Sequence, residues 1–232
     1  MLQHRPGDAR GHVEHGWLDA WHSFSFSSYH DPRWMGFGSL RVINEDRVVP
    51  TAGFPPHGHR DMEIITYVLG GELKHRDSTG TSGVLRHGDL QVMSAGRGIS
   101  HSEVNPSTRE TLHLLQIWIE PAVRGTPPAY AQQALDQDAL RRGFSTVVGP
   151  EHSGAAFTIL QDARLLIAWP TAGTTLNHVL DPQRRYYLHL ARGRVTLGAD
   201  TLVAGDALLF EHETALALTA AEDSELLLFD LA

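Results

Sequence analysis

Hydrophobic residues in this chain come in short runs separated by turn-forming residues. Residues 77–83 combine glycines with serines and threonines, which is typical of a hairpin loop, and the polar residues 1–15 are expected to be an irregular lead-in. Short strands at this spacing indicate an all-β fold with enough strands to close a barrel. The strands expected in the first half lie at residues 24–26, 40–43, 64–69, 73–76, 84–86, 90–93 and 112–119.

The pattern is interrupted after residue 119, where several prolines and a glycine predict a linker. A short helix is expected next, capped by Asp136 or Asp138 and ended by Gly143. We therefore predict two β domains, residues 1–125 and 126–232. The strands expected in the second domain lie at residues 157–160, 165–168, 186–190, 195–197, 207–210, 216–218 and 226–229.

Two short polar motifs carry the candidate chemistry. They are His57-Gly58-His59 and His101-Ser102-Glu103. Residues two apart on a strand point to the same face, so neighbouring strands would bring three imidazoles and a carboxylate together. This donor set suits a divalent transition metal with positions left open. A purely structural polar cluster would carry a heavy desolvation cost without a cation.

Glu63 is a second candidate for the carboxylate ligand. It lies four residues after His59. Because Glu63 and the four candidate ligands of the two motifs all occupy odd positions, strand alternation does not separate Glu63 from Glu103. Glu103 is much nearer to its histidine along an uninterrupted strand, although a turn after His59 would remove that difference. From spacing alone both carboxylates stay open.

The long segment from Phe24 to Glu103 resembles the pirin family of the cupin superfamily, and the resemblance extends over residues 16–120 and more loosely over the second half. It implies an all-β bicupin of two jelly-roll barrels with a short linker helix. It also implies one metal, most commonly iron, held by His57, His59, His101 and Glu103. Glu63 and His113 are then candidates for contacts behind the ligands.

The second domain contains no His-x-His or His-x-Glu pair, since His178 and His189 are isolated. We therefore expect a degenerate cupin without metal, and one metal per chain. Iron fits mixed histidine and carboxylate ligation, while manganese, cobalt, nickel, copper and zinc are also compatible. Of the other histidines in the first domain, His75 is expected to be exposed, whereas His113 alternates with leucines and is expected to line the barrel.

The resemblance implies a metal-dependent dioxygenase that uses O₂ to cleave the ring of a flavonol such as quercetin. Glu103 is the candidate base for the substrate hydroxyl. The alternative is a non-catalytic, iron-dependent, redox-sensing protein that regulates a protein partner. A zinc isomerase for sugar phosphates would need a basic pocket near the motifs, and no Lys/Arg cluster supplies one.

Composition narrows the remaining possibilities. The net charge of -8 argues against direct binding of nucleic acid, and the absence of cysteine excludes disulfides, thiolate metal sites and cysteine nucleophiles. The first residues lack the apolar core of a signal peptide, and no apolar run reaches the length of a membrane span. We expect a cytoplasmic protein that does not bind membranes.

Overall fold

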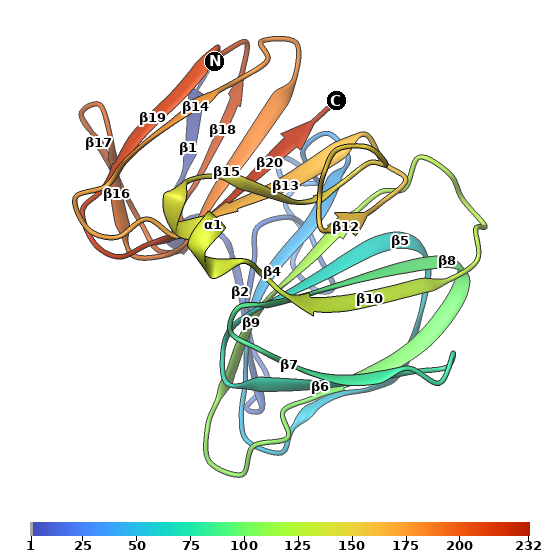
Figure 1. Cartoon of the computed structure of the whole chain (residues 1–232). Coiled ribbons are helices and arrows are strands. Elements are labelled where there is room, and N and C mark those ends of the chain that lie inside the picture. The colour runs from blue at the N-terminus through green and yellow to red at the C-terminus, as the bar shows by residue number, and fades with distance from the viewer. Residues whose placement is uncertain (1) are drawn as a thin grey trace. The chain divides into compact units, whose positions relative to one another are not determined.

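The chain folds almost entirely into β-strands, which confirms the predicted all-β class. The structure is a computed structural model that describes residues 2–232. Two compact units are present: the first comprises Arg10–Leu135, and the second comprises residues 2–9 together with Asp136–Ala232. Each unit is described separately below (Figure 1).

The first unit is built on one nine-stranded sheet with the order β2-β3-β4-β9-β5-β8-β6-β7, and β10 also pairs with β8. All of its strand pairs are antiparallel. Its strands are β2 (Gly11–Glu14), β3 (Leu18–His22), β4 (Leu40–Val48), β5 (Gly53–Gly70), β6 (Glu72–Asp77), β7 (Ser82–Arg86), β8 (Asp89–Val104), β9 (Leu112–Ile119) and β10 (Ala129–Ala134).

Strands β5 and β8 are the longest and run side by side (Figure 1). The first residues of β8 pair with β10, whereas its last residues pair with β6, so one continuous strand serves two parts of the sheet. The register shifts next to Asp61, which has φ +67°, opposite Gly96, which has φ +48°. Such irregularities bend a strand and let the sheet curve around an interior.

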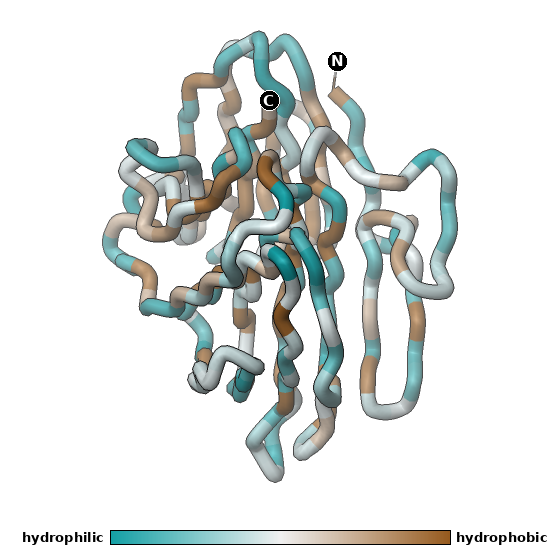
Figure 2. Tube along the Cα trace, turned by 90° about the vertical axis from the view of Figure 1, so that its right-hand side faces the viewer, coloured by the Kyte–Doolittle hydropathy of each residue, from teal (hydrophilic) through white to brown (hydrophobic). Residues whose placement is uncertain are grey.

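Buried apolar residues of these strands supply the core of the first unit. One cluster contains Leu18, Val48, Val68, Leu73, Leu85, Leu112 and Leu114, and another contains Ile64, Met93, Ala95 and Ile99. Figure 2 shows hydrophobic and hydrophilic residues interspersed at short intervals along the chain. Burial of aliphatic side chains is the main stabilising contribution.

The second unit contains a seven-stranded sheet (β1-β18-β15-β20-β13-β11-β12) and a four-stranded sheet (β14-β19-β16-β17). A leucine-rich core fills it, and Tyr186 stacks on Phe210 with ring centroids 5.5 Å apart. Its strands are β1 (Leu2–Arg5), β11 (Ser145–Gly149), β12 (Phe157–Thr158), β13 (Ala163–Ala168), β14 (Thr175–Val179), β15 (Arg185–Arg192), β16 (Arg194–Leu197), β17 (Asp200–Val203), β18 (Ala207–Glu211), β19 (Ala215–Ala220) and β20 (Glu225–Leu231).

The two helical elements are short. A 3₁₀ turn covers Gly7–Ala9, and α1 covers Gln137–Arg142. The side chain of Asp136 accepts a hydrogen bond from the amide of Ala139, and Gly143 follows the last turn, as the sequence predicts. Within residues 2–232, no helix has the length and apolar character needed to cross a bilayer.

Several elements differ from the sequence-based predictions. Residues 1–15 were expected to be irregular, but β1 and β2 lie there, because backbone pairing with β18 and β3 does not require an apolar pattern. The strand expected at residues 24–26 is instead a loop, in which the hydroxyl of Ser25 bonds to the backbone of Asp31.

The compact units also differ in extent from the predicted domains 1–125 and 126–232. Strand β10 pairs with β8 of the first unit, although it follows the proline-rich stretch that predicts a linker. Residues 2–5 pair with β18 of the second unit. As a boundary between independently folding domains, residue 125 stays a prediction.

Candidate metal centre

A cavity of about 420 Å³ opens inside the first unit. Its aromatic walls include Trp17, Phe26, Phe54 and Trp118, and its polar lining includes His22, Asn44, Asp46, His57, His59, His101, Glu103 and Gln116. A largely apolar cavity with a few convergent polar groups is the usual form of a small-molecule site.

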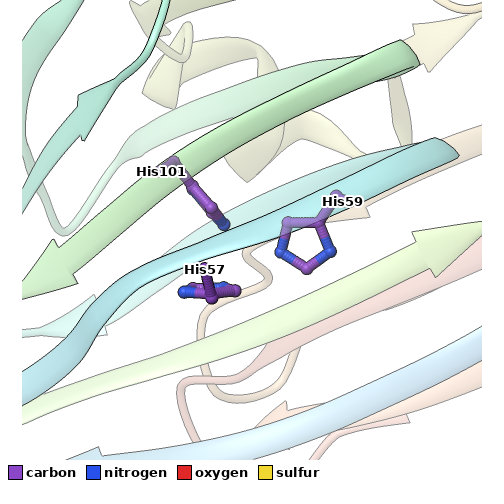
Figure 3. A group of neighbouring side chains, drawn as sticks. All are labelled: His57, His59 and His101. Carbon is purple, nitrogen blue, oxygen red and sulfur yellow. The ribbon is translucent and has the colours of Figure 1, made fainter.

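Three histidine side chains meet at one point of this cavity. His57 and His59 lie on β5, and the register places His57 directly opposite His101 on β8. The ring centroids are 4.5 Å apart for His57 and His101, and 4.8 Å apart for each pair that includes His59. Figure 3 shows the three side chains close together, with His101 extending from its strand toward the neighbouring strand, near His57 and His59.

The surroundings determine which nitrogens are available. Nδ1 of His57 lies 2.8 Å from the carbonyl oxygen of Pro55. Because a carbonyl only accepts, Nδ1 must carry the proton, which leaves Nε2 of the neutral ring with a lone pair. Nε2 of His101 is buried and has no hydrogen-bond partner in the described part of the chain.

Burial keeps the rings of His59 and His101 neutral. It lowers the pKa of His101 to about 3 and that of His59 to about 4, and the neighbouring histidines add to both shifts. Neutral imidazole is the form that ligates a metal. The rings therefore present lone pairs at neutral pH without first losing a proton.

Glu103 lines the same cavity and is 3% exposed. The side-chain amide of Gln116 donates to both of its carboxylate oxygens, at 2.7 and 2.6 Å, and the hydroxyl of Thr66 lies 3.4 Å from Oε1. Burial raises the pKa of Glu103 to about 7, although these hydrogen bonds lower it. One ligand atom each from His75, His101 and Glu103 also lie within 4.8 Å of one another.

Glu63 lies outside the lining of this cavity. It is buried, and its carboxylate accepts a hydrogen bond from the hydroxyl of Ser94. The register shift between His59 and Asp61 breaks the simple alternation, so that Ile64 lines the cavity in place of Glu63. The equal parity that left two carboxylates open in the sequence therefore does not hold through the bend.

Two other histidines lie where the sequence did not predict them. His75 was expected to be exposed but is completely buried on β6, beneath the ring of Tyr130. His113 was expected to line the barrel, yet its Nε2 lies 2.9 Å from Glu45 and its side chain is outside the cavity lining. Partial exposure of His113 fits this outward position.

Further polar residues of the site were not identified from the sequence. Asp46 is 3% exposed, and burial followed by the negative charge of Glu103 raises its pKa to about 8. His22 lies 2.8 Å from the side-chain oxygen of Asn44. Gln116 pairs in register with Asn44 on one side and Thr66 on the other. No short motif marks these residues, because the sheet register alone brings them together.

The donor set fits a divalent transition metal. Three imidazoles converge, one of them has a buried nitrogen without a hydrogen-bond partner in the described part of the chain, and a carboxylate lines the same cavity. Nitrogen and oxygen donors of this kind suit iron, nickel, copper, cobalt, manganese and zinc. An apolar wall limits the access of water, which strengthens electrostatic interactions inside.

Comparison with protein families gives two matches. The model described as Pirin matches residues 3–119, and the model described as quercetinase C-terminal cupin domain matches residues 146–231. The chain is 42% identical to a quercetin 2,3-dioxygenase of Escherichia coli over 232 residues, which is 100% of this chain and 99% of that protein. It is 43% identical to a pirin-like protein of Caulobacter vibrioides, with 100% of both chains covered.

Solved structures resemble the whole chain. The bacterial pirin YhhW of Escherichia coli in complex with nickel(II) aligns with a TM-score of 0.92 and 42% sequence identity, covering 100% of this chain and 99% of that one. A protein of Geobacillus kaustophilus aligns with a TM-score of 0.79 and 26% identity, covering 98% of this chain and 94% of that one.

Proposed function

Because the chain belongs to the pirin family, we propose that it is a metal-dependent dioxygenase that uses O₂ to cleave the ring of a flavonol such as quercetin. The observation that carries the proposal is the convergence of three histidines and Glu103 on one aromatic-walled cavity. The bicupin fold positions these groups, since β5 and β8 run antiparallel through the wall of the first unit.

The proposed ligands are His57, His59, His101 and Glu103, with one metal per chain. Mixed histidine and carboxylate ligation favours iron, and nickel is the metal named for the Escherichia coli relative. A bound transition metal would orient the substrate's deprotonated hydroxyl and tune its electron density for the addition of O₂.

Glu103 is the proposed base for the substrate hydroxyl. A carboxylate within reach of a bound hydroxyl is an ordinary proton acceptor, and in the metal-free protein burial raises the pKa of Glu103 to about 7. The side-chain amide of Gln116 donates a hydrogen bond to each carboxylate oxygen of Glu103. These hydrogen bonds would be replaced by contacts with the metal or the substrate if the carboxylate rotated toward the histidines. The same carboxylate can thereby serve as a ligand and as a proton acceptor.

The cavity walls suit a flat aromatic substrate. Trp118 meets the ring of His59 edge-on with centroids 5.0 Å apart, and Phe54 meets Trp17 in the same way at 5.1 Å. Polar substituents of the substrate find Asp46 and the His22–Asn44 pair on the same lining. Aromatic faces supply area, and the polar groups orient the ligand.

The test is anaerobic loading with Fe(II), followed by addition of quercetin and air. Oxygen uptake, loss of the flavonol absorption and metal content per chain are recorded for the parent protein, His101→Ala, Glu103→Ala and Glu63→Ala. The matched control is His113→Ala, because His113 is a histidine of the same sheet outside the cavity lining. We expect about one metal per chain in the parent protein. Turnover should be lost in His101→Ala and Glu103→Ala and retained in Glu63→Ala and His113→Ala.

Other outcomes point elsewhere. Turnover that survives Glu103→Ala but is lost in Glu63→Ala would overturn the assignment of the carboxylate. Tight iron binding without oxygen uptake would favour the redox-sensing regulatory role over catalysis. The cytoplasmic location and the absence of direct nucleic-acid binding stay predictions from the sequence.

A further inference from the structure

His75 lies directly behind the candidate metal ligands. It is completely buried on β6, in register with Glu103 of β8. The ring of Tyr130 from β10 stacks on it, with centroids 4.7 Å apart and an interplanar angle of 27°. Packing therefore fixes the plane of the His75 ring.

A chain of polar contacts connects the loop after β6 with the cavity. Oδ1 of Asp77 accepts from the amide and hydroxyl of Thr79, at 2.8 and 2.6 Å, and from the amide of Thr81 at 3.2 Å. Its other oxygen, Oδ2, lies 3.1 Å from Nε2 of His75. Nδ1 of His75 in turn lies 3.4 Å from Nδ1 of His101.

Only one assignment of protons to the nitrogens of His75 and His101 satisfies this series of contacts. The carboxylate of Asp77 only accepts, so Nε2 of His75 carries the proton, and Nδ1 of this neutral ring is then an acceptor. His101 must donate from its own Nδ1. Its Nε2, which is buried without a hydrogen-bond partner in the described part of the chain, is left with a lone pair.

We propose that His75 and Asp77 are positioning residues that hold His101 in the tautomer and orientation that ligate the metal. The inference rests on the proposed function, because it takes His101 as a ligand. Partners behind a ligating histidine fix its tautomer and ring orientation, and their loss typically weakens metal binding about 10- to 100-fold.

The sharpest variant is Asp77→Asn. The amide oxygen can keep the three bonds from Thr79 and Thr81, while the amide nitrogen replaces Oδ2 and turns an acceptor into a donor. His75 must then accept at Nε2 and donate from Nδ1, which drives the proton of His101 to Nε2. The matched control is Thr79→Val, which removes a bond to Oδ1 but leaves Oδ2 and His75 in contact.

Two measurements test the effect of these substitutions on His101 and on metal binding. Long-range ¹H–¹⁵N NMR of the metal-free protein identifies the tautomer of His101, and chelator competition gives the Kd for Ni(II). We expect Nδ1–H in the parent and in Thr79→Val, and Nε2–H in Asp77→Asn. The Kd should rise about 10- to 100-fold in Asp77→Asn and stay near the parent value in Thr79→Val.

An unchanged tautomer and an unchanged Kd in folded Asp77→Asn would overturn the proposal. If that variant does not fold, His75→Phe provides the test, because phenylalanine retains the stacking on Tyr130 but offers no acceptor; a parent-like Kd would again overturn the proposal. Failure of the proposed function looks different, since the parent would then bind no metal or take up no O₂, while the tautomer of His101 is still measured directly.

Discussion

Asp46 is an acidic residue on the cavity wall whose carboxyl group is protonated at neutral pH. Burial and the nearby charges of Glu103, Glu45 and Asp19 raise its pKa to about 8. The unfolded chain releases this proton near pH 4, whereas the folded metal-free protein retains it up to about pH 8. The contribution of Asp46 to stability therefore falls as the pH rises through this window.

The variant Asp46→Asn removes this titration. In metal-free protein we expect its unfolding free energy, relative to the parent, to increase from pH 5 to pH 8 by at most about 1.4 kcal/mol per pH unit. Urea unfolding at several pH values measures it. Asp200→Asn, at an exposed aspartate of β17, is the control and should show no such trend. A difference that stays constant with pH would show that Asp46 is already ionised in the folded protein.

Gln116 determines how readily Glu103 loses its proton. In Gln116→Leu both hydrogen bonds to the buried carboxylate disappear, so the pKa of Glu103 should rise above about 7. Because a ligating carboxylate must be deprotonated, the pH at which Ni(II) affinity rises should move upward. Chelator competition between pH 5.5 and 9 measures this shift.

Thr66→Val provides a graded comparison for the Gln116 prediction. The hydroxyl of Thr66 lies 3.4 Å from the carboxylate, which is longer than the contacts from Gln116, so the shift in Thr66→Val should be smaller. Identical pH profiles in the parent and Gln116→Leu would show that Glu103 does not contribute to metal binding in this pH range.

At the residue scale, local motifs identified side chains that the fold brings to one cavity, while their role as metal ligands stays a prediction. His57, His59, His101 and Glu103 all line one cavity, as their spacing and the family resemblance suggest. Asp46, Gln116 and His75 were missed, because their relation to the site depends on sheet register rather than on near neighbours in the chain.

Among the elements, the bend in β5 and β8 does most to place the site. Gly96 has φ +48°, and a Cβ atom there would lie 2.1 Å from the backbone oxygen of Thr126. Across the bend, Asp61 accepts a hydrogen bond from the amide of Gly125 at 2.8 Å. The segment before β10 is thus packed against the corner that separates Glu63 from the cavity.

Gly96→Ala should therefore be costly. A left-handed backbone and a clash with another backbone segment together predict a loss of at least about 2 kcal/mol in unfolding free energy. The bend that positions His101 should shift as well, so Ni(II) affinity should fall. The control is Gly198→Ala, which has φ +59° but no atom within 4 Å of its Cβ position and should cost only about 1 kcal/mol. Equal losses in both variants would mean that the contact with Thr126 is unimportant.

The lengths of β5 and β8 were not predicted from the hydrophobic pattern. The hydrophobic pattern predicts strands at residues 64–69 and 90–93, whereas β5 and β8 extend over 18 and 16 residues. The extensions carry prolines, glycines and histidines, which have little strand propensity, and they are held by pairing with each other and with β6. Long-range pairing overrode the local signal in the very segments that carry the ligands.

On the scale of the whole molecule, the two units differ in where potential metal ligands cluster. In residues 2–232, groups of three or more potential metal ligands occur only in the first unit. The second unit fills its interior with leucines and the Tyr186–Phe210 stack. Buried polar residues such as His189 and Asp206 are also present there. The second unit has no His-x-His or His-x-Glu pair, and its lack of a metal stays a prediction from the sequence.

The extent of the first unit gives a further prediction. The pairing of β10 with the first half of β8 implies that the fold needs residues up to 135, whereas the sequence predicts a boundary at 125. A fragment of residues 10–135 should remain soluble and bind Ni(II). A fragment of residues 10–125 should aggregate, because it exposes the edge of β8 and the His75 face that Tyr130 covers. Light scattering and Ni(II) titration of both fragments measure this. Equal solubility and affinity would instead support a boundary at residue 125, with β10 only an addition to an already complete barrel.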